Sequence, residues 1–316
     1  MDAIVKADSN ASLTDEDEII NGLSKANKEI SPKFFYDQKG SELFSQIMRL
    51  PEYYLTRTET RILQDNVEEI ASYAGKNNLL IEPGAGNCEK ITYLLEALHP
   101  KAFFPQDISH EFLAKTAEQL KQKFDWLNVI PLTGDFHDEI IIPDSYPDAK
   151  RVVFYPGSTI GNFNPEIAAD FLSRMRDLVG KGGGFIIGVD LQKDINILNA
   201  AYNDSMGITA AFNLNVLSHL NHLVGTDFDE SKFAHEAYYN PDKNRIEMHL
   251  ISMEDQRVTL GDRVFEFVLN ERIHTENSYK YTVDDFQKLT DSAGLTLEKS
   301  WFDDQQLFSV HYLSVN

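Results

Sequence analysis

Between residues 78 and 190 the chain alternates short apolar segments with segments that have a helical pattern. The apolar segments read LLIEP, AFFPQD, NVIPL, RVVFYP and GFIIGVD, and the segments between them include EKITYLLEAL, SHEFLAKTAEQLKQKF and PEIAADFLSRMRDLV. Strands joined by helices run parallel, because each crossover helix returns the chain to the edge of the sheet where it started. The alternation therefore predicts an α/β fold built on a doubly wound parallel sheet.

The C-terminal segment predicts one helix and then an antiparallel hairpin. Thr282 and Asp285 have the spacing of a capping pair, an apolar stripe follows them, and Gly294 marks the end of the helix. Two strand-like segments come next, LTLEKSWF and FSVHYLSV, joined by the turn-like DDQQ. We expect them to pair as an antiparallel hairpin that closes one edge of the sheet.

Two stretches outside the alternation predict a second domain. They mix helical signals, as in ITAAFNLNVLSHLNHL, with strand signals, as in RIEMHLISM and RVFEFVL. We expect one domain of residues 58–192 and 280–316, and a discontinuous α+β domain of residues 18–57 and 193–279. Residues 1–17 are expected to form a polar leader.

The charge balance limits the class of partner. The chain has 50 acidic and 29 basic residues and a net charge of −21, which repels phosphate backbones and anionic membranes. We therefore expect no nucleic acid partner, whereas a small zwitterionic or cationic substrate is compatible with this field.

No apolar run approaches the roughly 18 residues of a membrane span, and the polar start MDAIVKADSN lacks the features of a signal peptide. We expect a cytoplasmic monomer without membrane contact.

The sequence gives no support for a metal site. Cys88 is the only cysteine, which excludes a site of several cysteines, and His219 and His222 do not belong to a His-Glu-x-x-His pattern.

A glycine turn follows the first predicted strand. LLIEP runs into Gly84-Ala85-Gly86-Asn87, and these glycines let the backbone approach a ligand closely beside the start of a helix. The third glycine of the dinucleotide fingerprint is missing, and Glu89 would repel a pyrophosphate. A ligand without phosphates fits better, and S-adenosylmethionine is such a ligand.

Acidic residues at the ends of the next two strands suit its nucleoside part. Asp107 ends the second strand, 23 residues beyond Gly84, and is the candidate acceptor for both ribose hydroxyls. Asp135 and Phe136, at the end of the third strand, are candidates for the adenine amine and the adenine ring. Each carboxylate alone could be a helix cap, but together and in this order they favour an S-adenosylmethionine site.

Eight longer blocks carry a more specific signal: KFFYDQKGSELF, LPEYYLTRTE, GAGNCEK, GDF, GSTIGNF, AYNDSMGITAAFN, RIEMHL and TENSYK. Over nearly the whole chain they resemble the histidine-specific Nα-methyltransferases of ergothioneine biosynthesis. Pro83, Ala85 and Asn87 depart from the pattern of that family inside the glycine turn, and none of them removes a functional side chain. The resemblance implies a class I methyltransferase with a Rossmann-like sheet and a second, substrate-binding domain.

The same resemblance implies an activity and a set of site residues. The protein would methylate the α-amino nitrogen of L-histidine three times, converting S-adenosylmethionine to S-adenosylhomocysteine and producing hercynine. The cofactor would contact Gly84, Gly86, Asp107, Asp135 and Phe136, with Lys90 on its methionine carboxylate. Asn162 and Tyr202 would hold the histidine carboxylate, Tyr36 would lie near the amine, and the imidazole would be surrounded by Tyr53, Glu276, Ser278, Phe212 and Met248.

Other interpretations stay open at this point. From the residues alone, Asn162 can be a turn residue, the TENS segment can be an exposed turn, and the aromatic residues can be ordinary core packing. A related enzyme acting on another amino acid such as tryptophan is the nearest alternative function. A non-catalytic protein that binds S-adenosylmethionine is a more distant one.

Overall fold

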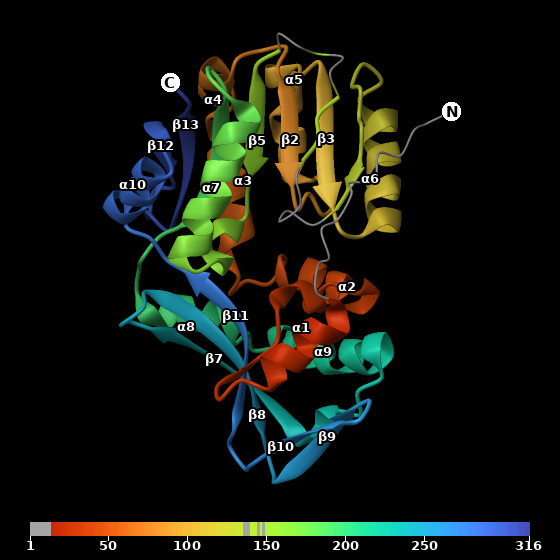
Figure 1. Cartoon of the computed structure of the whole chain (residues 1–316). Helices are drawn as coiled ribbons and strands as arrows, with labels where there is room; N and C mark the ends of the chain where they lie inside the picture. Colours follow the sequence, from red (N-terminus) through yellow and green to blue (C-terminus); the bar gives the residue numbers. More distant parts are fainter. Residues whose placement is uncertain (1–13, 135–139, 144–145, 147–148) are drawn as a thin grey trace. The chain divides into compact units, whose positions relative to one another are not determined.

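The computed structural model describes residues 14–134, 140–143, 146 and 149–316. Within this range the chain divides into two compact units. Unit 1 contains the chain up to Tyr54 and Lys193–Ser278, and unit 2 contains Leu55–Gln192 and Tyr279–Asn316. Each unit is thus assembled from segments that are far apart in the sequence. The colours of Figure 1 follow the sequence, so segments of one unit that are far apart in the chain have different colours.

A seven-stranded sheet forms the centre of the described part of unit 2 (Figure 1). Its strands, in spatial order, are β12 (Thr296–Phe302), β13 (Phe308–Ser314), β6 (Gly184–Asp190), β5 (Arg151–Tyr155), β2 (Leu79–Pro83), β3 (Ala102–Asp107) and β4 (Leu132–Thr133). The strands from β6 to β4 are parallel, and β13 is antiparallel to both β6 and β12. The predicted doubly wound α/β sheet and its antiparallel C-terminal hairpin are therefore confirmed.

Helices cover both faces of this sheet. The helices of unit 2 are α3 (Tyr54–Asp65, in this unit from Leu55 onward), α4 (Val67–Ala74), α5 (Leu95–Leu98), α6 (His110–Lys123), α7 (Pro165–Val179) and α10 (Val283–Ser292), with 3₁₀ turns η2 (Lys90–Tyr93) and η3 (Thr159–Asn162). On one face, Ile81 and Val153 share a core with Phe171 of α7 and Phe286 of α10. The alternate strand residues, such as Leu80, are equally buried. This two-sided burial explains why the strands read as continuous apolar runs.

Two elements differ from the sequence prediction. The predicted helix EKITYLLEAL is divided into η2 and the short α5, and the hydroxyl of Thr92 bonds to the Glu89 carbonyl oxygen. Side chains branched at Cβ and side-chain bonds to the backbone both disfavour a regular helix. The predicted strand NVIPL contributes only a bridge from Val129 to Phe103 and the first residue of the two-residue β4, Leu132, because Pro131 between them has no N–H to donate.

Unit 1 is an α+β structure with a separate four-stranded sheet. The sheet has the order β1 (Lys28–Glu29), β11 (Arg272–Tyr279), β8 (Arg245–Ser252) and β7 (Phe233–Asn240), and β9 (Gln256–Leu260) pairs with β10 (Arg263–Phe267). Its helices are α1 (Asp15–Leu23), α2 (Gln38–Ile47), α8 (Ile195–Tyr202) and α9 (Ile208–Val224), with 3₁₀ turns η1 (Pro32–Phe35) and η4 (Glu230–Lys232). The expected helix at ITAAFNLNVLSHLNHL is α9, and RIEMHLISM and RVFEFVL contain β8 and β10.

Helix α1 begins inside the segment expected to be a polar leader. Thr14 accepts the backbone N–H of Asp17, and the Asp17 carboxylate bonds back to Thr14. This reciprocal capping box stabilises a helix start at Asp15, so the expected leader of residues 1–17 extended too far.

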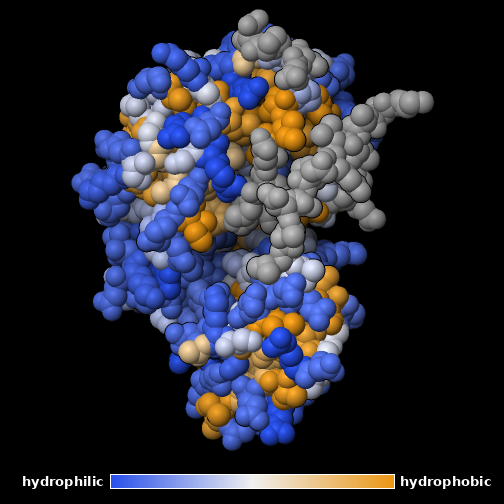
Figure 2. All heavy atoms as spheres, in the orientation of Figure 1, coloured by the Kyte–Doolittle hydropathy of each residue, from blue (hydrophilic) through white to orange (hydrophobic). Residues whose placement is uncertain are grey.

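The surface and the helices agree with the polar composition. The face drawn in Figure 2 is mostly hydrophilic, with apolar side chains in separate groups. Among the described residues no helix has the length and apolar character to span a bilayer.

Candidate active site

The order of strands in unit 2 points to one edge of the sheet as the candidate ligand site. In a doubly wound sheet, ligands bind beyond the carboxyl ends of the strands where the strand order reverses. Here the order reverses between β2 and β5, which are neighbours. The glycine turn follows β2, and Asn162 ends the 3₁₀ turn that follows β5.

The glycine turn keeps an open side. Gly84 and Gly86 have φ values of 65° and 52°, in the left-handed region that favours glycine. A Cβ atom added at either glycine would meet nothing within 4 Å. The backbone N–H of Ala85 bonds to the Gln106 carbonyl oxygen, which ties the turn to the end of β3. The turn is therefore anchored on one side and accessible on the other.

Asp107 holds the glycine turn in place. One carboxylate oxygen accepts the backbone N–H of Gly86 at 2.9 Å, and the other accepts the N–H of Ser109 at 2.9 Å. Each carboxylate oxygen has about two acceptor sites, so both can still accept a hydroxyl. Besides the ribose contact expected from the sequence, Asp107 therefore has a role in shaping the turn.

Lys90 forms an ion pair with Glu59, which the sequence pattern did not mark as a site residue. Its ammonium lies 2.5 Å from the Glu59 carboxylate, whose side chain is 1% exposed. Both oxygens of Glu59 also lie 2.9 Å from the backbone N–H of Gly157, at the end of β5. A Cβ atom at Gly188 would stand 2.0 Å from the Glu59 carboxylate, so the missing side chain at position 188 makes room for it.

A second buried carboxyl lies near this pair. Glu82 of β2 is 2% exposed, and one of its oxygens has no hydrogen-bond partner among the described residues. Burial raises the pKa of Glu82 well above its usual value; Lys90 lowers it, and the charges of Glu59 and Asp107 raise it. The end of β2 thus presents an unsatisfied polar atom beside the glycine turn.

Both missed carboxyls had a signal in the sequence. Glu59 falls on the apolar stripe of α3 formed by Leu55, Ile62 and Leu63, at spacings of four, three and four residues. Glu82 is the only charged residue of the strand LLIEP. A charge inside an apolar pattern indicates a buried group with a specific partner.

The segment that carries Asn162 is held by buried contacts within unit 2. Ser158, at φ 57°, accepts the backbone N–H of Asp190 through its hydroxyl. Asp190 in turn pairs with Lys280 at 2.6 Å, and both side chains are fully buried. A Cβ atom at Gly161 would lie 2.8 Å from the Tyr279 carbonyl oxygen, so close packing fixes the residue before Asn162.

Unit 1 contains six aromatic residues in one continuous group, the aromatic cluster: Phe35, Tyr36, Phe44, Tyr53, Tyr202 and Phe212. Phe212 of α9 stacks on Phe35 at 4.6 Å and contacts Tyr36 at 5.9 Å. Phe44 of α2 connects this part to Tyr53, and Tyr53 meets Tyr202 at 6.3 Å. Four residues predicted to bind the substrate are thereby brought together.

A buried hydroxyl pair extends the cluster to β11. The Tyr202 hydroxyl donates to the Ser278 hydroxyl oxygen at 2.8 Å. Glu276 lies half-buried on the same strand, and Met248 is 2% exposed on β8. All the residues predicted to surround the imidazole therefore belong to unit 1. Asn162 belongs to unit 2, and Asp135 and Phe136 lie outside the described residues.

No metal centre accompanies these residues in the part of the chain that the structure describes. There, no three His, Cys, Asp or Glu side chains are grouped so that they could hold a metal ion.

Comparison with known proteins identifies the family. A family model for SAM-dependent, histidine-specific methyltransferases matches residues 15–315. The chain is 38% identical over 289 residues to a histidine N-alpha-methyltransferase of Mycolicibacterium smegmatis, covering 89% of both chains. It is 37% identical to the protein of the same name from Mycobacterium tuberculosis, over 91% of this chain and 90% of the relative. It is also 31% identical to ergothioneine biosynthesis protein 1 of Neurospora crassa, over 87% of this chain and 32% of that longer protein.

Matches of this extent and identity leave one conclusion about its relationship: this chain belongs to the family of histidine-specific, S-adenosylmethionine-dependent methyltransferases.

Proposed function

We propose that the protein transfers three methyl groups from S-adenosylmethionine to the α-amino nitrogen of L-histidine, producing hercynine. The match of the histidine-specific family model to residues 15–315 carries this proposal. The relatives named histidine N-alpha-methyltransferase and ergothioneine biosynthesis protein 1 support the same substrate and the same pathway.

The residues of unit 2 fit the cofactor. The open side of the glycine turn leaves room at Gly84 and Gly86, and Asp107 keeps acceptor sites for the ribose hydroxyls. We assign Lys90 to the methionine carboxylate, where Glu59 would hold the ammonium in position. Asp135 and Phe136 remain assigned to the adenine. When bound, the cofactor supplies a methyl group on a sulfonium sulfur.

The residues of unit 1 fit an amino acid with an aromatic side chain. We assign Tyr202 and Asn162 to the carboxylate of histidine, and Tyr53, Glu276 and Ser278 to its imidazole, with Phe212 and Met248 lining the site. Unit 1 would thus bind the side chain of the substrate and unit 2 the cofactor. A carboxylate beside the imidazole can accept a ring N–H, which a tryptophan or phenylalanine ring does not supply in the same place.

The α-amine must lose a proton before it can accept a methyl group, because its reference pKa is about 8. Tyr36 is the candidate to accept or relay this proton, and its ring lies 5.9 Å from that of Phe212 in the aromatic cluster. Apolar rings around the amine disfavour its charged, protonated form by excluding water. Alignment and desolvation are then the main contributions of the protein, and no covalent intermediate is needed.

We also propose that the protein works as a cytoplasmic monomer without a nucleic acid partner. The net charge of −21 supports the last point, since it opposes binding to phosphate backbones.

Glu276 tests the choice of substrate. Replacing it by alanine removes a charge-assisted bond to the imidazole. Glu276→Ala should therefore lower kcat/KM for histidine by a factor equivalent to roughly 2 to 4 kcal/mol of transition-state stabilisation. Tryptophan should lose far less, because its binding no longer requires desolvation of a carboxylate. The measurement is the ratio of kcat/KM for histidine and tryptophan, at saturating cofactor, in the wild type and the variant.

Glu236 provides a matched control for this test. It is a carboxylate on β7 of the same unit that pairs with Arg272. Glu236→Gln should leave the substrate ratio unchanged. If Glu276→Ala lowers both substrates by one factor, Glu276 does not select the side chain and the main structural reason for preferring histidine is lost.

A further inference from the structure

A fully buried asparagine in unit 1 connects three strands. The Asn213 side-chain nitrogen on α9 lies 2.9 Å from the His249 carbonyl oxygen and 2.9 Å from Nδ1 of His235. Its side-chain oxygen accepts the hydroxyl of Thr275 at 2.8 Å. Asn213 therefore bonds to β8, β7 and β11 at once, and these bonds occupy both of its N–H groups and its oxygen.

The partners of this amide fix the protonation of His235. The His249 carbonyl only accepts, so the group of Asn213 that faces it must be the NH₂. The second hydrogen of this NH₂ points at Nδ1 of His235, which must then be an acceptor. At the other side of the ring, Nε2 lies 3.0 Å from the Tyr202 carbonyl oxygen and must carry a hydrogen. His235 is thus neutral, with its proton on Nε2.

Burial favours the same state. Desolvation lowers the pKa of His235, against smaller opposing effects from the bond to Tyr202 and the charges of Asp204 and Glu236. A proton on Nδ1 would face the N–H of Asn213, donor against donor, and break the connection.

This chain of hydrogen bonds leads to the proposed substrate site. His235 holds the backbone of Tyr202 at the end of α8, and the Tyr202 hydroxyl donates to Ser278. Ser278 and Thr275 are both on β11, so the bonds run from β11 through α9, β7 and α8 and back to β11. The same helix α9 places Phe212, next to Asn213, in the aromatic cluster.

We propose that Asn213 and the Nε2-protonated tautomer of His235 are positioning residues, which hold Tyr202 and Ser278 in the geometry that binds the amino acid substrate. The inference rests on the proposed function, because it concerns the site that would take histidine. Neither residue needs to touch the substrate.

Paired variants at position 235 separate positioning from simple packing. His235→Leu removes both polar contacts and should raise KM for histidine about tenfold, equivalent to one lost hydrogen bond of about 1.4 kcal/mol, with a smaller change in kcat. His235→Gln keeps an N–H donor for the Tyr202 carbonyl and should return KM to within about threefold of the wild type. The KM for S-adenosylmethionine should stay unchanged in both, because its proposed residues are in unit 2.

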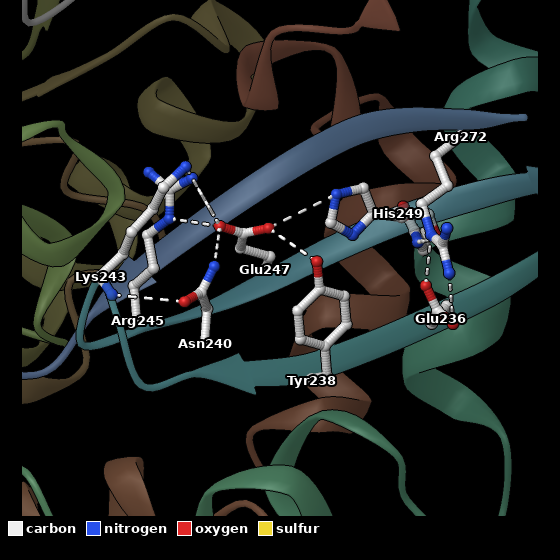
Figure 3. A network of polar contacts seen from close by, with 9 residues as sticks. Glu236, Tyr238, Asn240, Lys243, Arg245, Glu247, His249 and Arg272 are labelled. Atoms are coloured by element: carbon white, nitrogen blue, oxygen red, sulfur yellow. Dashed lines mark hydrogen bonds and ion pairs between the residues drawn. The ribbon is translucent and has the colours of Figure 1, made fainter. Parts of the chain in front are cut away.

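The opposite face of the same sheet offers a matched control. Tyr238 is also on β7, pairs across the strands with Glu247, and donates its hydroxyl to that carboxylate (Figure 3). Tyr238→Phe removes a polar contact of the same sheet without touching Asn213 or His235. It should leave KM for histidine unchanged, even if the melting temperature falls.

Nitrogen NMR of the imidazoles gives a readout that does not depend on activity. The His235 signal, assigned by its absence in His235→Gln, should show the Nε2-protonated neutral form at pH 7. In Asn213→Asp the carboxylate can only accept, so Nδ1 of His235 should become protonated.

The outcomes separate this inference from the proposed function. An Nδ1-protonated His235 in the wild type would overturn the positioning role, even if His235→Leu fails to fold. Folded His235→Leu and His235→Gln proteins with the same KM for histidine would also overturn it. An equal rise in the KM for histidine and the KM for S-adenosylmethionine would overturn it as well. A wild-type protein that does not methylate histidine, with His235 protonated on Nε2, would refute the function and leave the hydrogen-bond connection standing.

Discussion

The pair formed by Glu59 and Lys90 shows how single residues shape the proposed cofactor site. A buried carboxylate accepts bonds from an ammonium and from the Gly157 backbone, and Gly188 leaves the space that it fills. Charges removed from water are stable only when they are paired and hydrogen-bonded. The complete pair therefore destabilises the folded state little, whereas the loss of one member leaves an unpaired buried charge and destabilises it strongly.

A double-mutant cycle measures this dependence. Glu59→Gln leaves the mostly buried Lys90 ammonium without its counter-charge and should reduce the free energy of unfolding by about 3 kcal/mol. Adding Lys90→Met removes the orphaned charge and should recover at least about 1 kcal/mol. Urea unfolding of the wild type, the two single variants and the double variant gives the coupling.

The control lies on the same helix. Asp65 of α3 forms an exposed pair with Arg61, so Asp65→Asn should leave the unfolding free energy nearly unchanged. Additive losses for Glu59→Gln and Lys90→Met would show that the two side chains do not depend on each other.

At the residue scale, spacing predicted the positions of groups but not their partners. The sequence placed Asp107 at a strand end, but its bonds to Gly86 and Ser109 depend on how the turn folds back. The resemblance named Tyr202 and Ser278, which are 76 residues apart, without indicating their mutual hydrogen bond. Contacts between distant segments require the packed fold, which no local pattern contains.

The hairpin of β12 and β13 is an element whose stability depends on pH. His311 of β13 is fully buried, and its two ring nitrogens lie 2.7 Å from the hydroxyls of Ser300 and Ser309. Burial lowers the pKa of His311 to about 3. The folded state keeps this ring neutral, while in the unfolded chain it takes up a proton below its reference pKa of about 6.5. The contribution to stability is therefore complete above that pH and decreases as the pH falls toward 3.

This linkage gives a measurable loss in mild acid. Between pH 7 and pH 5 the titration of His311 should reduce the free energy of unfolding by about 2 kcal/mol. His311→Gln should be less stable at pH 7 but should lose about 2 kcal/mol less than the wild type over this interval. Urea unfolding at both pH values measures the difference, with His222→Gln on the exposed side of α9 as a control. Equal losses in the wild type and His311→Gln would show that His311 does not resist protonation.

At the element scale, strong periodicity in the sequence was sufficient to predict helices and strands, but local departures from them could not be predicted. The apolar strands, α7, α10 and the C-terminal hairpin follow directly from the patterns of residues 78–190 and 282–314. The segment after the glycine turn has the apolar spacing of one helix, yet it forms η2 and α5. Gly84, Gly86 and Cys88 precede this segment with positive φ values. They set the direction in which the chain enters the segment, and the apolar spacing does not predict this direction.

The whole molecule combines two cores, each made from separated parts of the sequence. The sheet order in unit 2, with β5 beside β2, brings together strand ends that are about 70 residues apart in the chain, and the candidate ligand site lies at these ends. The alternation of strands and helices predicted a parallel sheet but not this order, because several orders satisfy the same alternation. The order and the family match together support the account of an amino acid methyltransferase.

The most direct test incubates the purified protein with excess S-adenosylmethionine and an equal mixture of the twenty amino acids, and follows the products by mass spectrometry. The account predicts that histidine alone is consumed and gains three methyl groups on its α-nitrogen, with monomethyl and dimethyl forms as transient intermediates. Each of these intermediates, supplied separately, should also be converted to the trimethyl product. Methylation of another amino acid in preference to histidine, or a product that stays at one methyl group while cofactor remains, would contradict the account.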